Sequence, residues 1–284
     1  TAFLLSLLHL KSPNLMNTKI LVAVLILFLA IPSAARSQFA FSNEIGVIAG
    51  PLLFQSDFGL RNNYDTNINN QGLGIGLVHY FNFAYRADCN CYTRDRYFND
   101  HFKLRSEADL HYTNLTHEGY ESQKDSPEGQ DLRDHKGSSL VFELGMQLEY
   151  FPLSIRDFQA GAFKIAPYIS LGAHFVSFKP EYSSVQDVPG ASPEDIYFDR
   201  FLIGDGGELG GISDAAGTTW ALTGSVGIRY KLTILSDINL ELKYHKYHSN
   251  WVDGLNPDPE FYPPNKYDDS IVWLTIGYIY YLNF

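Results

Sequence analysis

Apolar and polar residues alternate with a period of two along most of this chain. Between Phe102 and Tyr112 most apolar side chains occupy every second position, and charged side chains such as Arg105 lie between them. This alternation predicts β-strands with one apolar face, because a helix would repeat its apolar residues every three or four positions. Eight segments show the pattern: 41–54, 72–84, 102–112, 140–150, 164–179, 220–231, 238–245 and 270–284.

The connections between these segments alternate in length. The longer ones are 55–71, 114–137, 180–216 and 248–269, which together hold 21 acidic and 6 basic side chains. The shorter ones are 85–100, 153–163 and 232–237. Long loops on one side and short turns on the other are typical of outer-membrane barrels, and strands of about 9–11 residues suffice to span. We therefore predict an all-β fold, an eight-stranded antiparallel transmembrane β-barrel of the outer membrane with four long acidic loops.

The first 37 residues have the features of an export signal. A short basic segment begins at Met16, an apolar run extends from Ile20 to Ile31, and small residues precede a cleavage site after Ser37. The apolar run is about a dozen residues, whereas a membrane helix needs ~20. We predict that residues 1–37 are an upstream extension plus a cleaved signal peptide with its start at Met16. Residues 38–284 would then form the barrel.

Composition and charge exclude several classes of protein. Residues 38–284 carry all 32 acidic side chains but only 18 of the 21 basic ones, so a nucleic-acid partner is not expected. Tyrosine and phenylalanine are abundant, at 19 and 20 residues, which disfavours a disordered chain. The 2 cysteines cannot form a disulfide scaffold.

The last predicted strand carries a pattern that suits outer-membrane assembly. Counting back from the final Phe284, apolar residues occupy every second position through Leu282, Tyr280 and Tyr278. A terminal phenylalanine with this alternation resembles the signal that the barrel assembly machinery recognises. We expect this face to contact outer-membrane lipid, with its aromatic rings at the interface.

The opposite faces of the strands predict a charged interior. If the apolar faces contact lipid, five cations and five anions point inward, and charges shut away from water need partners. The predicted lumen charges are Lys103, Arg105, Arg229, Lys231 and Lys243, together with Glu107, Asp109, Glu143, Glu149 and Glu241. Equal numbers of the two signs favour a salt-bridge network that closes the lumen over a selective pore.

No catalytic, cofactor or metal site is predicted. His245 and His248 are three positions apart, so a strand would point them to opposite faces. Ser106 and His111, considered as a catalytic pair, are five positions apart, so a strand would also point them to opposite faces. Gly72, Gly74 and Gly76 resemble a nucleotide-binding loop, but no helix follows, and we expect them to admit bulky neighbours or a bend.

The turn at 85–100 is longer than a barrel needs. Cys89 and Cys91 lie in it, and we favour a disulfide between them over a bond to a partner protein. Arginine and tyrosine are enriched where proteins bind proteins. The candidate docking residues in this turn are Arg86, Arg94, Arg96 and Tyr97. They would contact an unidentified periplasmic protein, while the alternative is that the aromatic residues only continue the strands at the membrane interface.

Three stretches carry a resemblance to known families: NEIGVIAG at 43–50, GLGIGLVHYFNFAYRADCNCYTRDRYFNDHFKLRSE at 72–107, and YIYYLNF at 278–284. They resemble an uncharacterised family of small outer-membrane barrels from Bacteroidetes, chiefly flavobacteria. More distantly, the layout and opening strand are similar to the PorG family of type IX secretion barrels. That likeness implies docking onto a periplasmic ring of secretion components through the turns, and it supplies no catalytic residue.

The sequence thus predicts a non-enzymatic outer-membrane barrel with a closed lumen that serves as a structural or docking component of a cell-envelope complex. The alternatives are an outer-membrane lipid-modifying enzyme, which needs serine, histidine and a carboxylate on the lipid-facing surface, and a small-solute pore.

Overall fold

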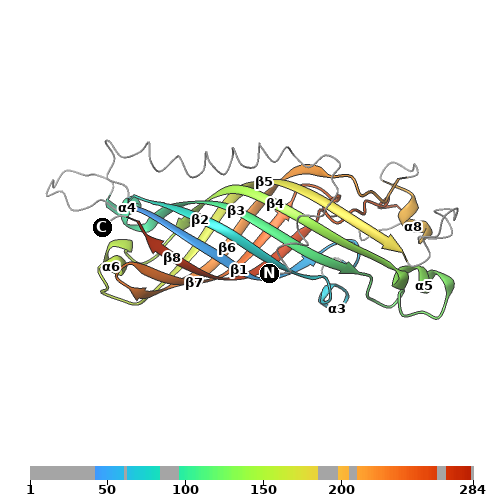
Figure 1. The fold of residues 1–284 in the computed structure, drawn as a ribbon, viewed down its shortest axis with the longest axis horizontal. Helices are drawn as coiled ribbons and strands as arrows, with labels where there is room; N and C mark the ends of the chain where they lie inside the picture. Colours follow the sequence, from blue (N-terminus) through green and yellow to red (C-terminus); the bar gives the residue numbers. More distant parts are fainter. Residues whose placement is uncertain are drawn as a thin grey trace, which may run out of the picture. The chain divides into compact units, whose positions relative to one another are not determined.

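Eight antiparallel strands form a closed barrel in the computed structural model, which describes residues 42–60, 63–83, 96–184, 198–204, 210–260 and 267–282. Each strand pairs with the next, and the first pairs with the last, as Figure 1 shows. The strands are β1 (Ser42–Gln55), β2 (Gln71–Asn82), β3 (Phe102–Thr116), β4 (His135–Tyr150), β5 (Ile165–Ser184), β6 (Gly217–Thr233), β7 (Ser236–Tyr247) and β8 (Ser270–Tyr281). The predicted number of strands and the predicted fold are confirmed.

At the ends that meet the long connections, β3, β4 and β5 extend furthest beyond the predicted segments. β3, β4 and β5 run on toward the long connections, where polar residues such as Asn114 and Ser138 replace the apolar ones on the outward face. The apolar alternation stops there, but backbone pairing continues, for example between Asn114 and Ser138. The turn between β6 and β7 is shorter than predicted, since only 234–235 separate the two strands.

The outside of the barrel is apolar over a continuous belt. On β6 the belt runs from Trp220 to Tyr230 and includes Leu222 and Val226, all of them exposed. Within the eight strands, outward-facing Asp, Glu, Lys or Arg residues occur only at four positions near the long-connection end: Lys136, Lys179, Glu181 and Lys246. Exposed apolar side chains outside and charged ones inside are the arrangement of a transmembrane β-barrel.

Short helices lie at both ends of the barrel. Figure 1 shows α4 (Arg96–His101) and α6 (Ile155–Gln159) at the end with the shorter connections, called the short-turn end below. At the opposite, long-loop end are α3 (Tyr64–Asn67), α5 (Pro127–Asp134) and α8 (Asp199–Leu202). Among the described residues no helix has both the length and the apolar character required to cross a membrane.

The long-loop mouth of the barrel is filled by its own connections. Val252 and Leu255 are buried in the same apolar cluster as Phe58 and Phe201. The hydroxyl of Ser139 on β4 donates a hydrogen bond to the carbonyl oxygen of Val252 at 2.5 Å. Because these side chains exclude water, the mouth is closed by apolar packing above the charged interior.

Candidate functional site in the barrel lumen

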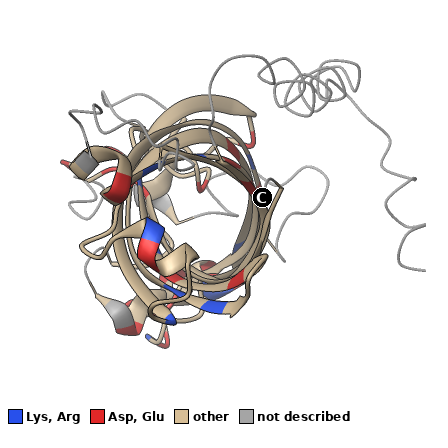
Figure 2. Cartoon of the chain, turned by 90° about the vertical axis from the view of Figure 1, so that its left-hand side faces the viewer, with Lys and Arg blue, Asp and Glu red and all other residues tan. Residues whose placement is uncertain are grey.

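The eight described strands bury twelve charged side chains in the barrel interior, each at most 8% exposed. Figure 2 looks along the barrel from the short-turn end and shows blue and red positions on its wall. The buried cations are Lys103, Arg105, Arg229, Lys231 and Lys243. The buried carboxylates are Glu44, Glu107, Asp109, Glu143, Glu149, Asp237 and Glu241. All ten residues that the sequence assigns to the lumen are among them.

Arg105 lies at the centre of this network. Its guanidinium donates hydrogen bonds to Glu149 Oε1, Glu241 Oε1 and Gln147 Oε1, each at 2.8 Å, and its Nε lies 3.0 Å from Glu107 Oε2. These partners come from β3, β4 and β7, so one side chain bridges the lumen. Charge-assisted hydrogen bonds of this kind offset the cost of burying the charges.

A second group of charges lies toward the short-turn end. Glu44 accepts hydrogen bonds from Lys103 Nζ and Arg229 Nη1, both at 2.6 Å. Arg229 also donates to Glu149 at 3.2 Å, and its guanidinium carbon lies 4.1 Å from the centre of the Tyr80 ring. Glu149 contacts both Arg229 and Arg105, so the two groups form one connected network.

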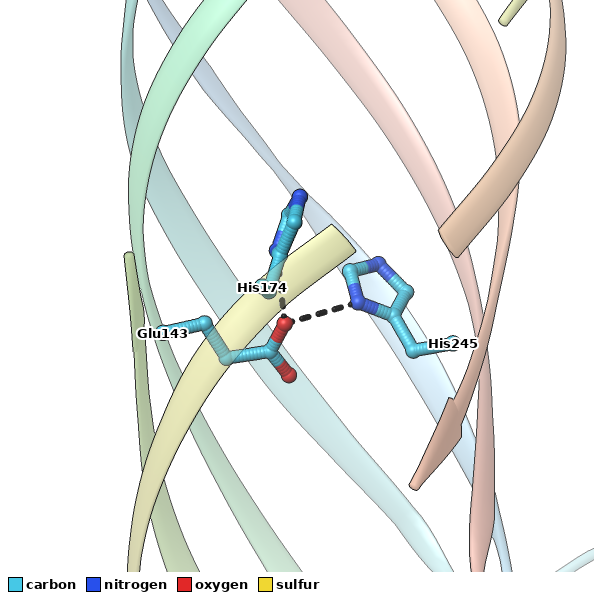
Figure 3. Close-up of side chains that lie close together, drawn as sticks. All are labelled: Glu143, His174 and His245. Carbon is cyan, nitrogen blue, oxygen red and sulfur yellow. Dashed lines mark hydrogen bonds and ion pairs between the residues drawn. The ribbon is translucent and has the colours of Figure 1, made fainter. Parts of the chain in front are cut away.

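Histidines surround a single carboxylate toward the long-loop end. His174 Nδ1 and His245 Nδ1 each lie 2.9 Å from Glu143 Oε2, as Figure 3 shows. On the other carboxylate oxygen, the Tyr247 hydroxyl donates a hydrogen bond at 2.7 Å and His111 Nδ1 lies at 3.4 Å. We call Glu143, His111, His174 and His245 the histidine cluster.

The sequence did not identify Glu44, Asp237 or the histidine cluster as a unit. Glu44 shares the inward face of β1 with Ile48, Leu52 and Phe54, which are all buried, so that strand shows no polar face. The histidines lie on different strands and are not neighbours in sequence. The alternation along each strand indicates that each histidine faces inward. Only the strand register shows that these histidines lie close to one another.

The glycines of β2 make room for side chains that cross the lumen. A Cβ atom built at Gly74 would lie 2.6 Å from the Trp273 ring, and one at Gly76 would lie 2.0 Å from Asp109 Oδ1. Contacts this close cannot be relieved without moving the neighbour. The predicted role of these two glycines in admitting bulky neighbours is confirmed.

Several of the other predicted site residues lie outside the described residues. These are Arg86, Cys89, Cys91, Arg94, the side chain of Arg96, and Phe284. Tyr97 on α4 is described: its hydroxyl lies 2.8 Å from the Tyr150 hydroxyl, and its ring stacks on His101 at 4.2 Å. Tyr278, Tyr280 and Leu282 are exposed on the outward face of β8 and its end.

A histidine pair lies beyond the apolar belt, at the long-loop mouth. His117 Nε2 is 3.0 Å from His135 Nδ1, and both rings pack on Phe58 and Phe201. Burial lowers the pKa of His135 to about 4. Burial and the neighbouring His135 hold the pKa of His117 well below its ordinary value. Both rings are therefore neutral near pH 7.

Acidification should weaken the packing of this mouth. Between the folded pKa of His135, about 4, and the unfolded value of about 6.5, only the unfolded chain binds the proton. The stability that neutral His135 contributes is thus fully present above about pH 6.5 and is lost as the pH drops toward 4. At pH 5 the free energy of unfolding should be lower by roughly 2 kcal/mol from His135 alone.

Denaturant unfolding of the wild type and of His135→Gln at pH 7.5 and pH 5 tests this expectation. The variant should lose less stability on acidification, by roughly the same 2 kcal/mol. An identical loss in both proteins would show that His135 does not titrate in this way.

Comparisons with known proteins give the following findings. No family model and no curated protein matches the chain. Among solved structures, Ail, the attachment invasion locus protein of Yersinia pestis, is 11% identical with a TM-score of 0.41, covering 86% of this chain and 100% of Ail. Neisserial surface protein A is 12% identical with a TM-score of 0.43, covering 84% and 96%. The outer membrane protein OprG from Pseudomonas aeruginosa is 15% identical with a TM-score of 0.39, covering 84% of this chain and 97% of OprG.

The strand pairing and the apolar belt, rather than these scores, establish this chain as a closed eight-stranded barrel of the transmembrane type.

Proposed function

We propose that this chain is a non-enzymatic, non-conducting barrel of the outer membrane that serves as a structural or docking component of a cell-envelope complex. The observation that carries the proposal is the closed lumen. Arg105 joins strands across the interior through four polar partners, and the long-loop mouth above it is packed with apolar side chains. An eight-stranded barrel has room inside only for its side chains, which disfavours a solute pore.

The outward surface supports a structural role over a lipid-modifying one. Ser106 faces outward on β3, whereas His111 of the same strand is buried in the lumen. Cross-strand pairing puts His79 opposite Ser106, but no hydrogen bond joins the two in the described part of the chain. The outward strand charges lie near the long-loop end, so no carboxylate completes a catalytic group beside Ser106 among the described strand residues.

The placement in the outer membrane follows from the same surface. Closed barrels with an outward apolar band and aromatic residues at its edges are the form that proteins take in that membrane. The expected signal peptide and the resemblance of 72–107 to barrels of Bacteroidetes support this placement. In the proposed orientation the acidic long loops face outward and the short-turn end faces the periplasm.

The short-turn end offers a platform for a partner. The β6–β7 turn closes with 234–235, whereas 83–101 and 151–164 carry α4 and α6. Arg156 on α6 lies 3.0 Å from Asp100 on α4, which links the two helices. Tyr97 is 61% exposed despite its contact with Tyr150. The PorG resemblance suggests the class of partner, a periplasmic component of a secretion-related complex.

Co-purification from native outer membranes tests the docking proposal. Substituting both Arg94 and Tyr97 with Ala should leave folding intact and release a periplasmic partner, because the proposed contacts of the arginine and the tyrosine with that partner are lost. A matched variant at the long-loop end, with Tyr120 and Lys179 replaced by Ala, should retain it; both residues are exposed there. Retention of every partner by both variants would mean that Tyr97 serves only the membrane interface.

A further inference from the structure

The histidine cluster has the geometry of a metal site. One oxygen of Glu143 lies 2.9 Å from both His174 Nδ1 and His245 Nδ1, and the three side chains converge from β4, β5 and β7 in Figure 3. Ligand atoms of these three residues all lie within 4.8 Å of one another. Two ligands at 2.0–2.2 Å from a tetrahedral ion are separated by about 3.3 Å, so an ion requires the nitrogens and the oxygen to move apart by a few tenths of an ångström.

Positive charge is lacking in the part of the lumen around the histidine cluster. The described strands bury seven carboxylates and five cations in the interior. Of these carboxylates, Asp109 and Glu143 are the two with no Lys or Arg nitrogen within 4.0 Å in the described part of the chain. Both lie beside the histidines. With neutral imidazoles, the carboxylate of Glu143 has no balancing positive charge beside it in this buried site, and a divalent cation bound there would supply one.

Several polar atoms of this region lack partners. Both nitrogens of His111, including the Nδ1 that faces Glu143, are buried and form no hydrogen bond with any described residue, and the same holds for Nε2 of His245 and both oxygens of Asp109. Buried polar atoms without partners are rare in folded proteins, and an absent ion is one recognised reason for them.

Glycines clear the space that the cluster occupies. A Cβ atom at Gly145 would lie 2.0 Å from Cδ2 of His174, and one at Gly74 would lie 2.8 Å from Cδ2 of His111. A Cβ atom at Gly76 would touch Asp109 in the same way. Three glycines on two strands, β2 and β4, thus admit three polar side chains of one region.

We propose that Glu143, His174 and His245 bind one divalent transition-metal ion, with His111 as a further ligand. Imidazole and carboxylate together select zinc or iron(II) over calcium and magnesium, which prefer oxygen ligands alone. Glu107 lies 3.4 Å from His174 Nε2 and would orient that ring from outside the coordination sphere. Glu107 is a poorer ligand because Arg105 and Lys243 already neutralise it.

The ion would have a structural role. The cluster lies between the salt-bridge network and the apolar mouth, and it joins β3, β4, β5 and β7 across the lumen. A metal bound by all four residues leaves no route for a substrate, so the site would stabilise the closed barrel. The sequence did not predict it because its ligands are brought together only by barrel closure.

Metal loading of the full-length, tag-free protein tests the proposal. The protein is refolded in detergent with excess Zn²⁺, passed through a chelating buffer and analysed for metal by mass spectrometry. Wild type should retain about one equivalent of Zn²⁺, and Glu143→Gln and His245→Gln should each retain none above background. The matched control is His248→Ala, which removes an exposed histidine of the same segment and should load as wild type does. Heat-modifiable migration on gels confirms that each variant is folded.

Cobalt substitution gives a second readout. Co²⁺-loaded wild type should show visible absorption bands of nitrogen- and oxygen-bound cobalt, and Glu143→Gln should lack them. Zinc should also raise the unfolding temperature of wild type and of His248→Ala, but not of Glu143→Gln. Equal retention of metal by wild type and the folded cluster variants, whether one equivalent or none, would overturn the proposal and leave the cluster as a hydrogen-bonded network.

Discussion

Arg105→Leu should lower the free energy of unfolding by roughly 3–5 kcal/mol. The substitution removes the cation that contacts Glu107, Glu149 and Glu241, all of them buried in the lumen. Leucine fills part of the space but cannot donate hydrogen bonds, so several buried carboxylate oxygens lose their partners. Urea unfolding of the barrel in lipid vesicles, followed by tryptophan fluorescence, measures the change.

The matched control for Arg105 is Lys179→Leu. Lys179 also faces a glutamate, Glu181, at 2.5 Å, but both side chains are more than half exposed at the long-loop rim. An exposed pair of this kind contributes about 0–1 kcal/mol. Similar effects of the two substitutions would show that Arg105 does not sit in a desolvated network.

Val226→Arg should destabilise the barrel by about 2–4 kcal/mol when it is folded in a bilayer. Val226 is 55% exposed and lies within the apolar belt of β6, between Trp220 and Tyr230. In lipid this position places a guanidinium in the hydrocarbon region, whereas in water an exposed arginine would cost almost nothing. The size of the destabilisation therefore shows whether lipid or water surrounds the apolar belt.

Thr218→Arg provides the comparison on the same strand. Thr218 faces outward beyond Trp220, at the edge of the belt, where the cost should fall to about 0–1 kcal/mol. Both variants introduce an arginine, and they differ only in the depth of that arginine in the membrane. Equal unfolding free energies for them would contradict a membrane position for the belt.

The strands and their faces could be predicted from the sequence because each is a local property. The alternation around Arg105 assigns that side chain to the interior without any knowledge of its partners. Strand number and order follow from eight such segments and the alternating lengths of their connections. The extra length of β3 to β5 could not be predicted, since the outward faces of these ends are polar, the apolar alternation stops there, and backbone pairing defines them.

The histidine cluster and the mouth could not be predicted because they depend on contacts across the barrel. Glu143 and His245 are separated by 102 positions, and register alone places them together. On β1 the buried Phe54 faces the interior as an apolar residue, which obscures the inward position of Glu44. The mouth depends on 251–257 folding back over the strands, and no local pattern signals that path.

Single-channel recording in planar bilayers tests the central claim, a closed lumen, most directly. Protein whose insertion is verified by heat-modifiable migration should produce no conductance steps under applied voltage, because the Arg105 network and the apolar mouth leave no continuous water path. Reproducible unitary steps from the purified wild-type barrel would contradict the account and establish it as a pore.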